Sequence, residues 1–164
     1  MKKGLVIVGP FVHALDKLSP KCLDYCSKGV IVVGNDGVIE KVFDTTNTHF
    51  SSLLETQWQE YERITLKPSQ IVIPGLVDTH AHAPQYFNSG LGLDLPLLEW
   101  LNTYTFPVES KFKDLQIAVR VYTSCVRRSL MNGTTTSVYF GTIHNDATLL
   151  LAKIVEELGQ RACK

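Results

Sequence analysis

Two histidines, His80 and His82, stand one residue apart in a chain of 164 residues. Neutral imidazole is the commonest metal ligand in proteins, and a catalytic zinc ion normally has three protein ligands and an open position for water. In an extended chain, side chains at i and i+2 project to the same face, so both imidazoles can reach one ion. A bare pair of this kind can be coincidental, so the surrounding residues decide.

These surroundings favour a metal site. Residues 70–78 are short and rich in β-branched side chains, with a bend at Pro74 and Gly75, and they predict a strand that ends at the two histidines. In parallel α/β folds, chemistry gathers at the carboxyl ends of strands. Asp78 could be a direct ligand, but we favour a supporting role in which it orients an imidazole or the chain.

The first third of the chain predicts a small all-β unit. Residues 5–8 form an apolar strand, and residues 29–34 and 38–42 form a hairpin around Asn35-Asp36-Gly37, whose residues tolerate positive φ. Apolar side chains at helical spacing predict a short amphipathic helix over 50–63 that packs on this sheet.

The later residues alternate between strands and helices. We expect helices over 97–104, 113–131 and 145–158 and a strand over 134–140. Asn145-Asp146 should cap the last helix and Gly159 should end it. The stripe expected to face the core in the long helix is Leu115, Ala118, Val119, Tyr122, Val126 and Leu130.

This alternation is typical of parallel strands with crossover helices, in a barrel or a doubly wound sheet. We place the domain boundary after residue 66, which gives a β unit at 1–66 and the first βα units at 67–164. A closed eight-stranded barrel needs about 250 residues. The chain therefore predicts the front part of such a fold.

The composition and net charge exclude several classes of function. The chain has 16 basic and 16 acidic residues, a net charge of zero and 45% hydrophobic residues. This excludes a disordered chain and any bulk attraction to nucleic acid or an anionic membrane, and favours a small, neutral substrate. The four cysteines, Cys22, Cys26, Cys125 and Cys163, form no dense framework and predict reduced thiols in a cytosolic protein.

Residues 74–82 resemble the first-strand metal signature of the amidohydrolase superfamily, which comprises metal-dependent hydrolases on a distorted eight-stranded barrel. Residues 94–101 and 104–107 are more selective and resemble the guanine deaminase family within it, as do residues 132–136 and 159–162. The resemblance implies an α/β fold that starts a distorted TIM-like (β/α)8 barrel, incomplete in this chain. The N-terminal part of a small β-sandwich precedes the barrel.

The resemblance also implies zinc-dependent hydrolysis of guanine to xanthine and ammonia, a step of purine catabolism. His80 and His82 would be ligands of one Zn2+ per complete active site, and the complete enzyme would be a homodimer. The acid/base residues of the family come later than this chain. The residues that would line the guanine pocket are His82, Ala83, Pro84, Gln85, Trp100 and Leu101, although Trp100 and Leu101 fit ordinary helix packing equally well.

We expect the chain to be a truncated, inactive form. Two alternatives remain open. One is a non-catalytic fragment or isoform that pairs with a full-length partner, and the other is a different deaminase of the same superfamily.

Overall fold

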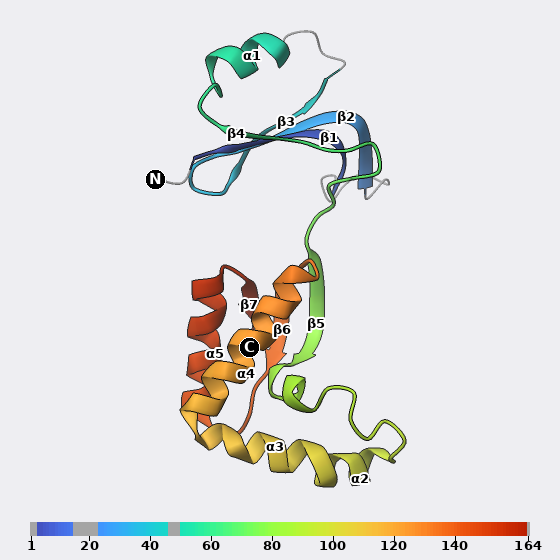
Figure 1. Ribbon diagram of the computed structural model, residues 1–164, viewed down its shortest axis with the longest axis vertical. Helices are drawn as coiled ribbons and strands as arrows, with labels where there is room; N and C mark the ends of the chain where they lie inside the picture. The colour runs from blue at the N-terminus through green and yellow to red at the C-terminus, as the bar shows by residue number, and fades with distance from the viewer. Residues whose placement is uncertain (1–2, 15–22, 46–49, 164) are drawn as a thin grey trace. The chain divides into compact units, whose positions relative to one another are not determined.

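The computed structural model describes residues 3–14, 23–45 and 50–163 (Figure 1). Its contacts divide the chain into two compact units, Met1–Pro74 and Gly75–Lys164. The division lies after Pro74 rather than after residue 66, because Val72 pairs with the first strand of the N-terminal unit. The Val72 backbone accepts a hydrogen bond from Val12 at 2.9 Å and donates one to Pro10 at 3.0 Å.

The N-terminal unit contains a four-stranded sheet in the order β3-β2-β1-β4. The hairpin prediction is confirmed, because β2 and β3 pair antiparallel around the predicted turn. Asp36 Oδ1 accepts the backbone N–H of Val38 at 2.9 Å, and Gly37 adopts a φ of 83°. The strands are β1 (Leu5–Ala14), β2 (Leu23–Val33), β3 (Ile39–Asp44) and β4 (Glu62–Thr65).

Helix α1 (Phe50–Thr56) is shorter than the helix predicted over 50–63. The prediction that this segment packs on the sheet is confirmed, because Leu54 and Trp58 are buried against Val6, Val30 and Val32. After Trp58 the chain turns and then forms β4, a strand that the apolar periodicity did not predict. Strand β4 lies parallel to β1, whose backbone groups supply its hydrogen bonds.

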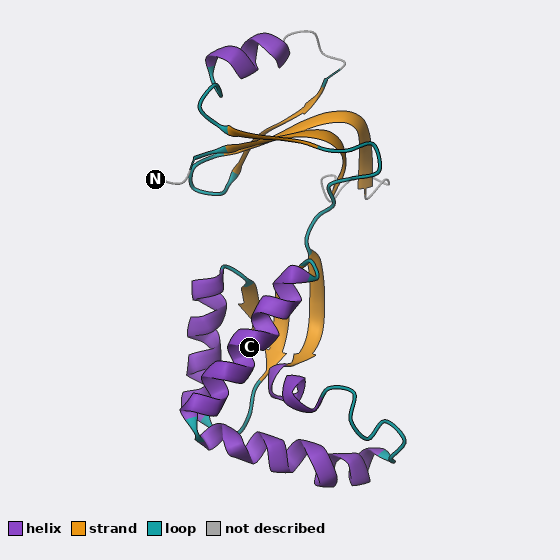
Figure 2. Cartoon of the chain, viewed as in Figure 1, coloured by secondary structure: helices purple, strands orange, loops and turns teal. Residues whose placement is uncertain are grey.

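The second unit contains a parallel sheet in the order β5-β6-β7 (Figure 2). Helix α4 connects β5 to β6 and helix α5 connects β6 to β7, so the predicted α/β alternation is confirmed. The short strand β7 was not predicted. The elements are β5 (Leu76–His82), α4 (Leu115–Met131), β6 (Thr134–Phe140), α5 (Asn145–Leu158) and β7 (Arg161–Cys163).

A series of short helical segments connects β5 to α4. The helix predicted over 97–104 instead continues to residue 110, through a π-helical turn and a final α-helical turn. No helix in the described part of the chain is long and apolar enough to cross a bilayer. The segments are η1 (Ala83–Asn88), α2 (Leu97–Trp100), η2 (Leu101–Thr105), α3 (Phe106–Ser110) and η3 (Lys111–Lys113).

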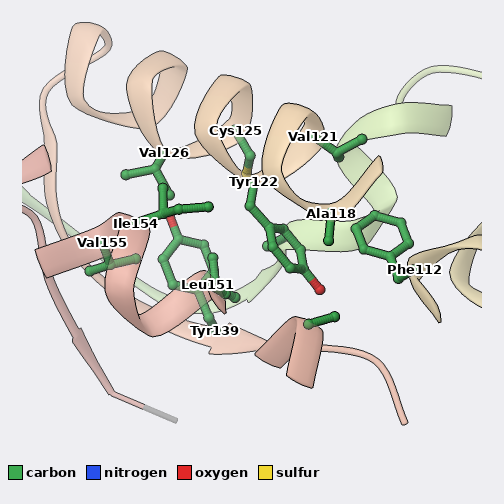
Figure 3. Close-up of a cluster of buried hydrophobic side chains, with 12 residues drawn as sticks. Phe112, Ala118, Val121, Tyr122, Cys125, Val126, Tyr139, Leu151, Ile154 and Val155 are labelled. Carbon is green, nitrogen blue, oxygen red and sulfur yellow. The ribbon is translucent and has the colours of Figure 1, made fainter. Parts of the chain in front are cut away.

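The core of the second unit lies between α4, α5 and β6 (Figure 3). The predicted stripe of α4 is partly wrong, because Leu115 and Val119 are 43% and 38% exposed. Val121 and Cys125 are buried in the core instead, beside Tyr122. The core face of α4 is therefore rotated relative to the predicted stripe.

The ends of the long helices follow ordinary capping chemistry with one exception. Asp114 Oδ1 accepts the backbone N–H of Gln116 at 2.8 Å at the start of α4. Gly159 ends α5 with a φ of 77°, as predicted. The predicted cap of α5 is wrong, because the N-cap residue is His144 and it makes no side-chain capping bond.

A buried polar link joins the end of α5 to β6. Tyr139 donates its hydroxyl hydrogen to Gln160 Oε1 at 2.8 Å, and Gln160 Nε2 donates to the Thr134 carbonyl at 2.9 Å. Because buried polar groups are costly when unpaired, these bonds fix the chain where it leaves α5. This link leads the chain into β7.

Gly75 is required by a close approach between β5 and β6. A Cβ atom at Gly75 would lie 2.6 Å from the Cβ of Thr135, a contact that no rotamer change can relieve. We therefore expect Gly75→Ala to lower the free energy of unfolding by about 1–3 kcal/mol. Urea denaturation measures this loss. The double variant Gly75→Ala/Thr135→Gly should recover most of it, and a stable Gly75→Ala single variant would contradict the contact.

Burial of Cys125 and Tyr122 makes the second unit sensitive to alkali. Burial raises the pKa of the Cys125 thiol to about 11 and that of the Tyr122 hydroxyl to about 12. The unfolded chain loses these protons at lower pH, so the Cys125 contribution is complete below about pH 8.5 and is lost as pH rises through about 11, and the Tyr122 contribution is complete below about pH 10 and is lost as pH rises through about 12. Denaturation between pH 7 and 11 should show falling stability.

The Cys125→Ala variant should show less of this fall, and an unchanged pH dependence would contradict the assignment. Thiol alkylation with peptide mapping at pH 8 gives an independent check. The exposed Cys163 should react before the buried Cys26 and Cys125. Cys22 lies outside the described residues.

Candidate metal centre at the end of β5

Strand β5 contains a bulge between Asp78 and Ala81, and this bulge includes His80. Asp78 pairs with Ser137 and Ala81 pairs with Tyr139, so β5 has one more residue than β6 between these two positions. Bulges re-aim side chains and are frequent beside active sites. Asp78 Oδ1 accepts the backbone N–H of His80 at 3.0 Å, and this bond stabilises the bulge. Asp78 thus contacts the backbone of a candidate ligand.

The bulged strand brings the two predicted ligands together. His80 Nε2 and His82 Nε2 lie 2.9 Å apart, and the ring centroids lie 4.9 Å apart. A zinc–nitrogen bond is about 2.0–2.1 Å long, so an ion placed to one side of the line that joins the two Nε2 atoms can contact both. The donor set and its spacing therefore fit a zinc ion.

Phe140, the last residue of β6, contacts both imidazoles. Its ring stacks on His80 with centroids 4.5 Å apart and on His82 with centroids 4.8 Å apart. His82 and Phe140 are direct partners in the parallel ladder. The sequence patterns assigned no role to Phe140. Its place at the end of the strand predicted over 134–140 could have indicated that it lies near the histidines, which end the preceding predicted strand.

The described residues contain no cluster of three or more His, Cys, Asp or Glu side chains that could hold a metal ion. His13 belongs to the N-terminal unit, where its Nε2 atom lies 3.6 Å from Asp24 Oδ2. His144 is half-buried beside α5. His49 lies outside the described residues. Among the described residues, His80 and His82 are thus the pair of histidines whose ring nitrogens lie close enough together to be candidate ligands of one ion.

The residues predicted to contact a substrate follow the histidines on η1. Ala83 and Pro84 are fully buried, so in this structure neither residue exposes atoms to a ligand. Gln85 is half-buried, and its Nε2 donates to Glu109 Oε1 over a long 3.5 Å. Because this bond is weak, the Gln85 amide can exchange it for a ligand at little cost.

Trp100 and Leu101 lie at the junction of α2 and η2. Trp100 donates its Nε1 hydrogen to the Leu91 carbonyl at 2.7 Å. Its side chain borders a hollow of about 330 Å³ that is also lined by Gly92, Leu93, Leu95 and Leu97. Leu101 is half-buried at the start of the π-helical turn. The structure thus shows packing contacts for Trp100. Helix η2, which begins at Leu101, contacts η1.

A larger cavity of about 590 Å³ lies where η1, η3 and α4 meet, and neither histidine borders it. Its walls are mainly aromatic and aliphatic, with two cationic side chains. The lining residues are Tyr86, Phe87, Val108, Lys111, Phe112, Ile117, Arg120, Val121 and Ser124. The metal centre and this cavity are therefore separate features.

Comparison with known proteins gives a consistent family. Residues 71–164 match the model of the Amidohydrolase family. Over 97 residues the chain is 59% identical to guanine deaminase of Mus musculus, covering 59% of this chain and 21% of that protein. The chain thus spans about a fifth of the length of the curated relatives it matches.

Solved structures show the same similarity over nearly the whole chain. A guanine deaminase from C. acetobutylicum with bound guanine superposes with a TM-score of 0.76 at 33% identity, covering 98% of this chain and 35% of that one. An adenosine deaminase from Xanthomonas campestris with bound zinc superposes with a TM-score of 0.70 at 23% identity, covering 96% and 32%. The latter supports the fold alone.

The bulge can be tested through the Asp78 carboxylate. We expect Asp78→Ala to remove the acceptor of the His80 amide, at a cost of about 1 kcal/mol, so that this amide exchanges with deuterium roughly five-fold faster. NMR-detected hydrogen exchange measures the rate. Asp78→Asn keeps an acceptor oxygen and is the matched control. Equal exchange in Asp78→Ala and the parent chain would show that the carboxylate does not hold the bulge.

Proposed function

The chain belongs to the amidohydrolase family, and we propose that its protein catalyses the zinc-dependent hydrolytic deamination of guanine to xanthine and ammonia. The observation that carries this proposal is the convergence of His80 and His82 at the end of β5, inside the segment that matches the family. The similarity to guanine deaminases supports guanine rather than another substrate.

We assign the zinc ion to His80 and His82. When bound, zinc supplies the Lewis acidity that makes water a nucleophile near neutral pH. The chain's own contribution is to hold the two Nε2 atoms 2.9 Å apart. The bulge and the Asp78 bond hold His80, while the pairing of β5 with β6 holds His82.

We assign guanine recognition to residues that follow the ligands. The Gln85 amide offers a donor and an acceptor, which suits the edge of a purine. Ala83 and Pro84 would form the buried base of the pocket beside His82, and Trp100 and Leu101 would contribute apolar surface for a flat ring. We assign the acid/base role to no residue of this chain. The resemblance implies that the acid/base residues of the family follow the segment that this chain matches.

The wider setting follows from the same proposal. A guanine deaminase acts in purine catabolism, and we propose a cytosolic homodimer that uses neither nucleic acid nor membrane as a partner. The net charge of zero supports a small, neutral substrate.

A segment exchange tests the function. We replace the matching segment of mouse guanine deaminase with residues 71–164 of this chain and measure ammonia release from guanine with added zinc. We expect the hybrid to be active, and His82→Ala in the hybrid to lower kcat/KM by roughly 100-fold or more, because a metal ligand is lost. A folded hybrid that binds zinc but releases no ammonia from guanine would overturn the substrate assignment.

The 164-residue chain tested alone should release no ammonia, because catalytic zinc normally has three protein ligands and the described residues bring two together. Turnover by this chain that disappears in His82→Ala would overturn the expectation that it is inactive. It would also show that further ligands come from within or between chains.

A further inference from the structure

We propose that Phe140 is a positioning residue that holds the His80 and His82 rings in the orientation needed to bind one zinc ion. This inference rests on the proposed function, since it assumes that the two histidines are metal ligands. It adds a residue that carries no donor atom and acts only through the two imidazoles.

The geometry places one aromatic ring against two ligands. The Phe140 ring lies 4.5 Å from the His80 ring at an interplanar angle of 27°, and 4.8 Å from the His82 ring at 13°. The His80 and His82 rings are inclined to each other by 37°. Both imidazoles therefore rest on a common flat surface, with their Nε2 atoms 2.9 Å apart.

The ladder explains why one side chain reaches both rings. His82 and Phe140 are opposite each other across β5 and β6, and the ring of the bulged His80 stacks on the same phenyl group. Phe140 thus covers a face of two side chains that are otherwise open to solvent, since His80 is exposed and His82 is half-exposed.

Stacking is compatible with metal binding. The lone pair on Nε2 lies in the plane of the imidazole, so a ring against the face leaves this atom free to bind a metal ion. A metal-bound imidazole also carries more positive charge, and the face of a phenyl ring attracts positive charge within about 6 Å. The contact should therefore strengthen when zinc binds.

The alternative is that Phe140 serves only the packing of the sheet. Its side chain is 43% exposed and lies outside the buried core cluster, so its removal leaves no cavity in the core. A purely structural role would therefore predict little change in zinc binding when the ring is removed.

The experiment measures the zinc affinity of the purified chain by competition with a chromophoric chelator. NMR of the histidine ring protons provides a second readout. We expect Phe140→Ala to weaken zinc binding about 10–100-fold, the range found when groups that orient metal ligands are removed. Phe140→Tyr keeps the flat ring and should bind within about three-fold of the parent chain, whereas Phe140→Leu keeps apolar bulk without the flat face and should be weakened.

Phe106→Ala is the matched control, because Phe106 is a similarly exposed phenylalanine on α3. It should leave the zinc affinity unchanged. In the absence of zinc, Phe140→Ala should shift the histidine ring protons, since they lose the ring current of the stacked phenyl group. Circular dichroism confirms that each variant is folded.

The outcomes separate this inference from the proposed function. If the parent chain binds zinc, His82→Ala abolishes binding and Phe140→Ala binds as well as the parent chain, the positioning role is wrong and the metal site stands. If the parent chain binds no zinc, or binds it independently of His80 and His82, the positioning role is overturned, and the segment exchange then tests the proposed function separately.

Discussion

The parallel pairing of β5 with β6 is the constraint on which the candidate site depends. It sets Ala81 opposite Tyr139 and His82 opposite Phe140, and so aligns the carboxyl ends of the two strands. Strand β5 is otherwise poorly buried, with Leu76 and Val77 more than half exposed. Its position therefore comes mainly from the backbone ladder and from Gly75, whose lack of a side chain permits the close approach to β6. A shift of this register would separate the histidines from Phe140.

The register is secured from the opposite face of the sheet. Tyr139 is buried in the core with Tyr122 of α4 and Leu151 of α5 (Figure 3), while the ring of its neighbour Phe140 stacks on the two histidines. Alternation along a strand makes the burial of one residue fix the direction of the next. The core of the second unit thus orients the site. The Gln160 link to Thr134 and Tyr139 adds a polar restraint at the same strand.

Much of this arrangement was predictable because its signals are local. The β-branched residues of 134–140, the Asn35-Asp36-Gly37 turn and the glycine after α5 each reflect a preference of a few neighbouring residues. The same holds for the i, i+2 spacing of His80 and His82, which predicts a shared face in any extended chain. The elements that were not predicted depend on partners that are distant in the sequence. Strand β4 has little apolar character and exists because β1 provides its hydrogen bonds, and β7 is short and pairs only with β6.

The candidate site also combines features that local sequence predicts with features that depend on residues distant in the sequence. That His80 and His82 form a pair follows from their spacing, but their separation of 2.9 Å follows from a bulge that only the comparison of β5 with β6 reveals. The contact with Phe140 joins residues more than fifty positions apart, and it depends on both registers being known. The local pattern thus identifies which side chains can bind a metal ion. The cross-strand neighbours decide whether their donor atoms meet at one point, and a phenylalanine without any donor atom belongs to the site for this reason.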